Sequence, residues 1–206
     1  MTQTTPYRIF TPRLLLRCWG PADAPALAEL VGRNLEHLRP WMPWASEENT
    51  QLDLQYERLR GARARFDLDQ EYIFGIFSRD SQAVLGSTGL HTRVGEGALE
   101  IGYWIDEGHT RQGLATEASA ALTKTAFDIY KVDRVEIHCD PKNLASAAVP
   151  RKLGYTLEAI LRRRSNDYYG KPSDSMIWTL LDDEYPASPS ASIAIEAYDA
   201  MDRRIL

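Results

Sequence analysis

The sequence has little cysteine and no long apolar run. Only Cys18 and Cys139 occur among 206 residues, and their separation fits neither a C-x-x-C pair nor a disulfide framework. No segment approaches the ~20 apolar residues that a membrane-spanning helix requires, and residues 1–6 lack the basic and apolar parts of a secretion signal. We therefore expect a cytoplasmic protein without a membrane partner, whose cysteines are small buried side chains.

The sequence also lacks an excess of positive charge, with 24 Lys and Arg residues against 29 Asp and Glu. The formal net charge is −5, whereas nucleic-acid binding depends on dense positive charge, so nucleic acid is not expected as a partner. Hydrophobic residues make up 44% and charged residues 26%, which is typical of a globular chain of one domain. No metal is expected, because the histidines lack the spacing of metal ligands. They are interpreted as structural or incidental: His37, His91, His109 and His138.

Apolar alternation and helical periodicity divide the chain into strands and helices. Strands are expected at residues 13–19, 72–77, 83–90, 98–106, 134–139, 155–161 and 174–181. Helices are expected from residue 21 and at 34–44, 49–66, 111–130 and 143–152. Antiparallel strands come first and a strand–helix–strand unit follows, which predicts an α/β fold with a mixed sheet covered by helices. Residues 186–192 are interpreted as a flexible linker, and residues 193–206 as a tail that forms a docking helix.

The transition from the strand at 98–106 to the next helix carries the clearest functional signal. A tight turn at Gly113 leads into a helix whose first residues, Ala115 among them, are small. A helix start exposes unpaired backbone N–H groups and the positive end of the helix dipole, so a phosphate group can bind there. The turn has one glycine instead of G-x-G-x-x-G, and it lacks the Walker lysine. The sequence therefore predicts a site for a diphosphate of another kind.

Four segments together resemble the GCN5-related N-acetyltransferase (GNAT) superfamily, in its branch of RimJ/RimL-like ribosomal-protein N-terminal acetyltransferases. They are residues 11–17 (TPRLLLR), 37–44 (HLRPWMPW), 100–117 (EIGYWIDEGHTRQGLATE) and 143–155, which begins with NLAS and ends with KLGY. The resemblance covers residues 8–182 and leaves 183–206 as a linker and C-terminal tail. It implies a mixed, mostly antiparallel sheet of about seven strands, flanked by helices, whose central pair splays apart to admit acetyl-coenzyme A (acetyl-CoA).

The resemblance also implies which residues would bind acetyl-CoA. Backbone amides of the turn would hold its diphosphate: Arg111, Gln112, Gly113, Leu114, Ala115 and Thr116. The splayed strand would run beside the pantetheine arm, with a backbone N–H on the thioester carbonyl: Trp104, Ile105 and Asp106. Asn143 would hydrogen-bond the pantetheine, and a helix N-cap is its other role. Thr110 stands where the family has Gln or Arg, so Arg111 or Gln112 would replace that contact.

Two residues are candidates for the chemistry. An ammonium acceptor must lose a proton before it attacks, and Glu100, on the strand that follows the cleft, is the candidate base. The alternative for Glu100 is a surface carboxylate paired with Arg93 or Arg134. Other nearby acids are Glu158 and Asp167. By the resemblance, Ser146 would protonate the departing thiolate, and its alternative is a role in capping or packing its helix.

The acceptor side remains open in the sequence. Trp41 and Trp44 either line an acceptor pocket or belong to the core. The resemblance implies direct attack of a primary amine on acetyl-CoA in a ternary complex, with a protein N-terminal amine as the favoured acceptor. The alternatives are acetyl transfer to a small-molecule amine, such as an amino acid, polyamine or antibiotic, and a non-catalytic acyl-CoA-binding module. Many relatives dimerise, so a homodimer is a further expectation.

Overall fold

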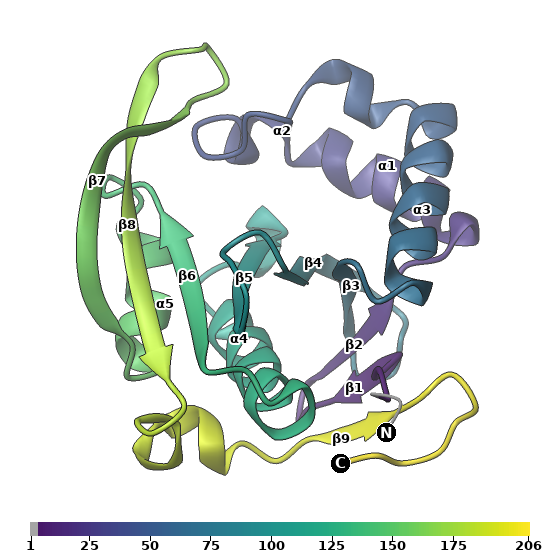
Figure 1. Ribbon diagram of the computed structural model, residues 1–206. Helices are drawn as coiled ribbons and strands as arrows, with labels where there is room; N and C mark the ends of the chain where they lie inside the picture. The colour runs from purple at the N-terminus through teal and green to yellow at the C-terminus, as the bar shows by residue number, and fades with distance from the viewer. Residues whose placement is uncertain (1–3) are drawn as a thin grey trace.

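The described part of the chain, residues 4–206 of a computed structural model, contains one sheet of nine strands (Figure 1). Residues 1–3 of the amino-terminal segment considered above lie outside the described residues. The strands are β1 (Arg8–Phe10), β2 (Leu14–Cys18), β3 (Tyr72–Ser78), β4 (Val84–His91), β5 (Ala98–Ile105), β6 (Arg134–Cys139), β7 (Thr156–Asn166), β8 (Pro172–Leu181) and β9 (Glu196–Tyr198). Their order is β7-β8-β6-β5-β4-β3-β2-β1-β9, and only β5 and β6 pair in parallel.

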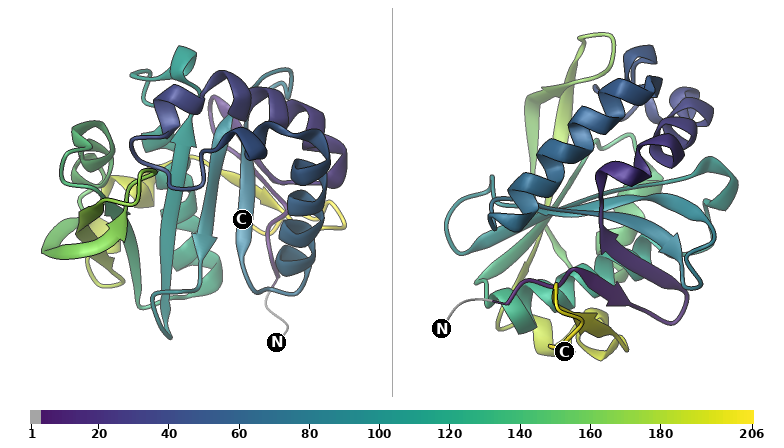
Figure 2. Two further views of the ribbon diagram at one scale, coloured as in Figure 1. Left: turned by 90° about the horizontal axis from the view of Figure 1, so that it is seen from above. Right: turned by 90° about the vertical axis from the view of Figure 1, so that its right-hand side faces the viewer.

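Helices cover both faces of this sheet. They are α1 (Ala24–Arg33), α2 (Leu35–Leu38), α3 (Leu52–Asp67), α4 (Leu114–Thr125) and α5 (Leu144–Lys152). Alternate residues of a strand point to opposite faces, so Leu14 and Leu16 join the core beside α4 and α5, while Leu15 joins the core beneath α1. Figure 2 shows α1 and α3 on one side of the sheet and α4 on the other. Alternate apolar residues of β2 thus contribute to two hydrophobic cores, one on each face of the sheet.

The central pair of strands separates along its length. β5 and β6 pair only where Ala98–Glu100 lie beside Arg134–Glu136. β5 then continues to Ile105 against β4, and β6 continues to Cys139 against β8. The edge of β5 after Glu100 therefore faces an opening instead of a strand, and the predicted central splay is confirmed.

The predicted fold class is confirmed, but the number of strands is nine where about seven were expected. The additional strands are β1 and β9, which pair with each other at the edge of the sheet. Each has three residues, which is too short for an alternation of apolar and polar positions to be recognised. They form because β1 also pairs with β2, and β9 adds to the edge that β1 leaves open.

The C-terminal segment differs from the flexible linker and docking helix that its composition suggested. Two 3-10 turns, Tyr185–Ala187 and Pro189–Ser192, follow β8, and the second packs against α4. Ser190 is fully buried there, and Lys124 Nζ donates a hydrogen bond to the carbonyl of Ala191 at 2.8 Å. The chain then crosses to β1 as strand β9, in which Ala197 is fully buried. Pairing with β1 satisfies the backbone groups of this segment, which a helix would satisfy internally.

Three helices also differ from their expected bounds. The helix expected at 34–44 is α2, which ends at Leu38. The helix expected at 49–66 is α3, preceded by a 3-10 turn at Glu47–Thr50. The helix expected at 111–130 begins only at Leu114 and gives way to a π-helical turn at Ala126–Tyr130. Within residues 4–206, none of the helices combines the length and apolar character needed to span a bilayer.

Candidate active site

The turn before α4 presents unpaired main-chain donors. β5 leads into a 3-10 turn at Glu107–His109, and then Arg111 and Gly113 adopt left-handed φ angles of 59° and 79°. Gly113 is the N-cap of α4, and its carbonyl accepts the first helical hydrogen bond, from Glu117 N–H. No residue in the described range 4–206 accepts a hydrogen bond from the N–H groups at positions 111–116. These donors and the helix dipole together make a site for an anion.

Contacts from the first hairpin hold this turn in place. Arg13 Nη1 donates to the carbonyl of Gln112 at 2.9 Å, and Arg13 Nε donates to Glu117 Oε2. Thr11 Oγ1 donates to the other carboxylate oxygen of Glu117 at 2.6 Å. Residues of the TPRLLLR segment therefore support the turn from about a hundred positions away in the sequence.

Main-chain donors on alternate residues of β5 point into the splay. Asp106 N–H donates to the carbonyl of Leu85 on the β4 side at 2.8 Å. Along an antiparallel strand, the N–H groups of alternate residues point to the same side. The N–H of Trp104 therefore points toward β4, as that of Asp106 does, and the N–H of Ile105 points toward the opening. Of the three β5 residues expected to bind the cofactor, Ile105 therefore has the free donor. The Trp104 side chain instead packs on Trp44, with ring centroids 6.0 Å apart.

The carboxylate of Asp106 fastens the end of β5 to the junction of α1 and α2. Only 5% of this residue is exposed. Its oxygens accept hydrogen bonds from Arg33 at 3.1 and 3.2 Å and from Asn34 Nδ2 at 2.6 Å, and His109 Nδ1 lies 2.7 Å away. Burial opposes its ionisation, but these partners outweigh burial and lower the pKa of Asp106 to about 2. The side chain therefore positions the strand, while its own oxygens are already engaged.

The start of α5 lies against the face of β5 that carries Tyr103, opposite to the face that carries Trp104. Asn143 is the helix N-cap, and its Oδ1 accepts a hydrogen bond from Ser146 N–H at 3.0 Å. Ser146 Oγ lies 3.1 Å from the hydroxyl of Tyr103, which also donates to the Ser146 carbonyl at 3.0 Å. Burial raises the pKa of Tyr103. Two hydroxyl groups thus meet beside the splayed edge, and the N-cap role considered for Asn143 is present.

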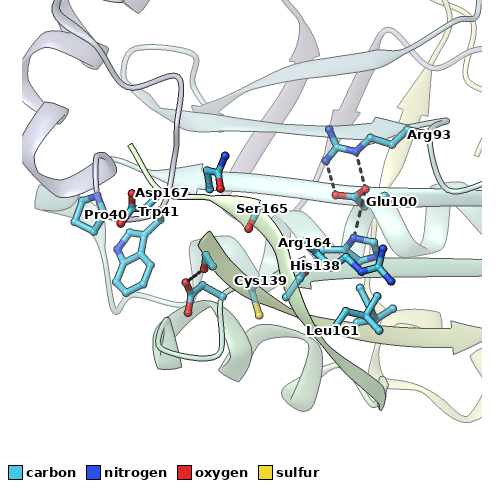
Figure 3. Close-up of a pocket in the computed structure, with 15 residues that line it drawn as sticks. Pro40, Trp41, Arg93, Glu100, His138, Cys139, Leu161, Arg164, Ser165 and Asp167 are labelled. Carbon is cyan, nitrogen blue, oxygen red and sulfur yellow. Dashed lines mark hydrogen bonds and ion pairs between the residues drawn. The ribbon is translucent and has the colours of Figure 1, made fainter. Parts of the chain in front are cut away.

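A cavity of about 520 Å³ lies where β5 and β6 diverge (Figure 3). Its wall is formed by both strands, by the loop after α2 and by the β7–β8 hairpin. The lining includes acidic, basic and aromatic side chains: Trp41, Arg93, Glu100, His138, Asp140, Arg164 and Asp167. Trp41 belongs to this wall and Trp44 does not, since Trp44 packs between Trp104 and the guanidinium of Arg58.

Glu100 lines the cavity as one half of an ion pair. Its carboxylate accepts two hydrogen bonds from the guanidinium of Arg93, with Nε 2.7 Å from Oε2, and only 4% of Glu100 is exposed. Burial alone would raise its pKa, but the hydrogen bonds and charge of Arg93, with a contribution from His138, lower it. Of the two partners considered from the sequence, Arg93 pairs with Glu100, while Arg134 pairs with Glu136.

His138 is a cavity residue that the sequence interpretation treated as incidental. Its Nε2 lies 2.7 Å from Glu136 Oε2, and its Nδ1 lies 3.8 Å from Glu100 Oε2. Figure 3 shows Glu100 between Arg93 and His138. Alternation along β6 puts Glu136 and His138 on one face, and this signal was available in the sequence. The missing information was the register of β6 against β5, in which Glu136 lies opposite Glu100.

The two other acids considered as bases occupy different positions. Asp167 lines the cavity, where its Oδ1 accepts backbone hydrogen bonds from Tyr169 and Lys171, both at 2.9 Å. Glu158 lies outside the cavity wall and accepts a hydrogen bond from Thr179 Oγ1 at 3.0 Å. Asp167 therefore contributes negative charge to the cavity while it closes the turn between β7 and β8.

Comparison with known proteins places these features in a family context. The family model described as an acetyltransferase (GNAT) domain matches residues 13–156, which is more than half of the chain. The probable N-acetyltransferase YjcK of Bacillus subtilis is 30% identical over 144 residues, which cover 68% of this chain and 79% of that protein. The putative ribosomal N-acetyltransferase YdaF of the same organism is 30% identical over 175 residues, covering 84% and 93%.

Solved structures agree on the fold. Mycobacterium smegmatis RimJ in complex with CoA-disulfide superimposes with a TM-score of 0.79 at 24% sequence identity. The match covers 91% of this chain and 90% of that chain. The open, mostly antiparallel sheet flanked by helices is therefore shared with this neighbour.

Proposed function

The chain belongs to the GNAT acetyltransferase family, and from this premise we propose that it transfers an acetyl group from acetyl-CoA to a protein N-terminal amine. Transfer would occur by direct attack in a ternary complex. The observation that carries the proposal is the open edge of β5, which runs from the cavity at Glu100 to the unpaired donors of the turn before α4. An acyl donor and an amine acceptor can meet only where such an edge joins two binding regions.

The residues of the turn fit the diphosphate of acetyl-CoA. The N–H groups at positions 111–116 have no partner within residues 4–206, and Gly113 has no side chain to cover them. Backbone donors of this kind do not depend on side-chain identity, so Thr110, which stands in place of the family's Gln or Arg, removes only one contact. Asn143 and the edge at Trp104 and Ile105 would lie along the pantetheine arm.

Acetyl-CoA supplies the activated acetyl thioester, and the protein supplies position and proton transfer. Ile105 N–H would donate to the thioester carbonyl, where negative charge develops in the transition state. The hydroxyls of Ser146 and Tyr103, 3.1 Å apart, would deliver a proton to the departing sulfur. No acyl-enzyme is required, because holding the amine against the thioester converts the reaction into an effectively intramolecular step.

The cavity favours a cationic acceptor. Its lining has three carboxylates, Glu100, Asp140 and Asp167, against two guanidinium groups, Arg93 and Arg164, and Trp41 adds a planar apolar surface. An ammonium group on a flexible peptide end could enter between the loop after α2 and the β7–β8 hairpin. The relative YdaF is named a putative ribosomal N-acetyltransferase, which supports a protein N-terminus as the acceptor.

An acceptor screen tests this proposal. The protein is incubated with acetyl-CoA and with ribosomal N-terminal peptides, amino acids, polyamines and aminoglycosides, while thiol release and the acetylated product are followed. We expect kcat/KM for a peptide to exceed that for the small amines by at least about tenfold, equivalent to ~1.4 kcal/mol of transition-state binding. Preference for a small amine would overturn the choice of acceptor. Binding of acetyl-CoA without thiol release on every acceptor would instead indicate an acyl-CoA-binding module.

A further inference from the structure

In the cavity wall, His138 Nδ1 and Glu100 Oε2 face each other, and both act as hydrogen-bond acceptors. Glu136 determines that Nδ1 is the acceptor nitrogen of His138. The Glu136 carboxylate accepts from Arg134 Nε at 2.8 Å and lies 2.7 Å from His138 Nε2. An ionised carboxylate can only accept, so His138 Nε2 must carry the proton of the ring in its neutral form. Nδ1 of His138 is then a lone pair, and it lies 3.8 Å from Glu100 Oε2, which is likewise only an acceptor.

This arrangement fits a cationic donor between the two atoms. While the ring is neutral, neither Nδ1 nor Oε2 can donate a hydrogen bond to the other, and both belong to residues that line the cavity. An ammonium nitrogen has several N–H groups and can donate to two acceptors that are this far apart. Arg93 already holds Glu100 in position from the other side, so the carboxylate does not need to move.

We propose that the acceptor ammonium binds between His138 Nδ1 and Glu100 Oε2, and that His138 is the general base of the reaction. The inference rests on the proposed function and names the residue that deprotonates its substrate. One N–H bond of the ammonium breaks, and its proton passes to Nδ1. The nitrogen lone pair then forms the C–N bond to the acetyl carbon, while the C–S bond breaks and its electron pair leaves on sulfur, which takes a proton from the hydroxyl pair at Ser146. The nitrogen loses its second proton as the amide forms, and this proton replaces the one that the hydroxyl pair gave up, so the products are the amide, the CoA thiol and protonated His138.

His138 is better suited to this proton transfer than Glu100. The Arg93 ion pair holds the pKa of Glu100 below its ordinary range, which makes that carboxylate a poor match for an ammonium. In its neutral form, the His138 ring offers Nδ1 as a basic nitrogen that is not engaged by Glu136. Glu100 instead supplies negative charge that attracts the ammonium to the base.

Glu136 is a positioning residue in this scheme. It holds the ring of His138 in the tautomer with a free Nδ1, and Arg134 holds Glu136 in turn. Neither Glu136 nor Arg134 belongs to the cavity wall, so they would act through His138. Charged groups surround the ring from several elements: Glu136 and Arg134 on β6, Asp140 after it, Glu100 on β5, Arg93 in the loop before β5, and Arg164 on β7.

The pH dependence of turnover tests the base. In His138→Gln, the amide can still donate toward Glu136 but offers no basic nitrogen. We expect kcat with an N-terminal peptide to fall about 100-fold at pH 7, the lower end of what a general base contributes. The loss should shrink as the pH rises through ~8, the pKa of a peptide amine, because free amine then becomes abundant. Acetyl-CoA affinity, measured by calorimetry, should be unchanged and also reports that the variant folds.

Variants of Glu136 and Glu100 distinguish the positioning and binding roles from the role of the base. Glu136→Gln should reproduce a weaker version of the same pH-dependent loss. Glu100→Gln should raise KM for the peptide about tenfold, as expected for loss of a charge-assisted hydrogen bond, and leave the pH profile of kcat unchanged. His91 provides the matched control, because it also pairs with a glutamate, Glu71 at 2.8 Å, but lies outside the cavity wall. His91→Gln should therefore keep wild-type turnover at every pH.

The outcomes distinguish this inference from the function on which it rests. If the wild type releases thiol but His138→Gln has a parallel pH profile, His138 is not the base and the proposed function stands. A changed profile in Glu100→Gln alone would transfer the role to Glu100. If the wild type releases no thiol with any acceptor, the proposed function fails and the inference fails with it. Should His138→Gln not fold, His138→Asn with the same measurements replaces it.

Discussion

The turn before α4 and the cavity beside β6, the two proposed binding sites, are built by different means. The turn offers main-chain N–H groups from consecutive residues, positions 111–116, and a glycine keeps them uncovered. The cavity is built from side chains of five separate segments, including Trp41, Glu100 and His138. Backbone conformation follows from local sequence, whereas a constellation of side chains depends on the whole fold. We therefore expect the proposed donor site to tolerate substitution of most side chains and the proposed acceptor site not to tolerate it.

The largest effect is expected when a side chain covers the main-chain donors at positions 111–116. Gly113→Trp places a large side chain over the turn and forces a residue with a Cβ into φ of +79°. We expect acetyl-CoA affinity to fall by at least about 100-fold, since two charge-assisted hydrogen bonds of ~1.5 kcal/mol or more are lost. Calorimetric titration with acetyl-CoA measures the change.

Gly170→Trp is the control for backbone strain. Gly170 has a nearly identical φ of +76°, and a Cβ there would meet nothing within 4 Å. Both variants should lose a similar ~1–2 kcal/mol of stability, the cost of a left-handed conformation, but only Gly113→Trp should lose acetyl-CoA binding. Unchanged affinity in Gly113→Trp would show that the diphosphate binds elsewhere.

A second prediction concerns the residue that joins the two regions. Asp106 ties the end of β5, just before the turn, to α1 and α2, which carry the cavity loop. Its pKa of about 2 lies below the ordinary 3.8, so its stabilisation is complete above pH ~4 and is lost as the pH falls through ~2. Asp106→Asn should therefore lower the free energy of unfolding by about 2 kcal/mol at pH 7, at ~1.4 kcal/mol per pKa unit.

Urea unfolding at a series of pH values measures this difference. The wild type and Asp106→Asn should converge between pH 4 and pH 2, because the wild-type carboxylate is then protonated. Asp202→Asn is the control, since Asp202 forms an exposed ion pair with Arg8, and exposed pairs contribute ~0–1 kcal/mol. A constant gap between wild type and Asp106→Asn across the pH range would mean that hydrogen-bond geometry, not charge, supports the strand.

The same contrast explains what could be predicted from the sequence. The turn before α4 was predicted from Gly113 and the small residues after it, which are adjacent in the sequence, whereas its support by Thr11 and Arg13 was not. The long strands were found by their alternation, and the splay was expected from the family resemblance. The three-residue strand β9 was missed, because its existence depends on pairing with β1, almost two hundred positions away. Local patterns carry no information about such a partner.

The cavity was only partly foreseen for the same reason. Glu100, Trp41 and Asp167 were named as candidates, but the other residues of the β7–β8 hairpin that complete the wall, Arg164 among them, were not. His138 was dismissed because it lacks the spacing of a metal ligand, although its neighbour Glu136 stands two positions before it. A histidine and a glutamate on one face of a strand become informative only when the neighbouring strand diverges and exposes that face.

The smallest expected effects concern two tryptophans, one inside and one outside the cavity wall. Trp41 and Trp44 were equivalent candidates in the sequence, but only Trp41 lines the wall, where it is 36% exposed. Trp41→Ala should raise KM for a peptide acceptor about three- to fivefold with little loss of stability, in line with ~0.5–1.5 kcal/mol for an aromatic contact. Trp44→Ala removes the packing on Trp104 and should lower the melting temperature while leaving KM within about twofold, since ordinary packing contacts act on stability. Steady-state kinetics and thermal unfolding of both variants separate the two roles, and a reversed pattern would move the acceptor site from the Trp41 side of the loop to the Trp44 side.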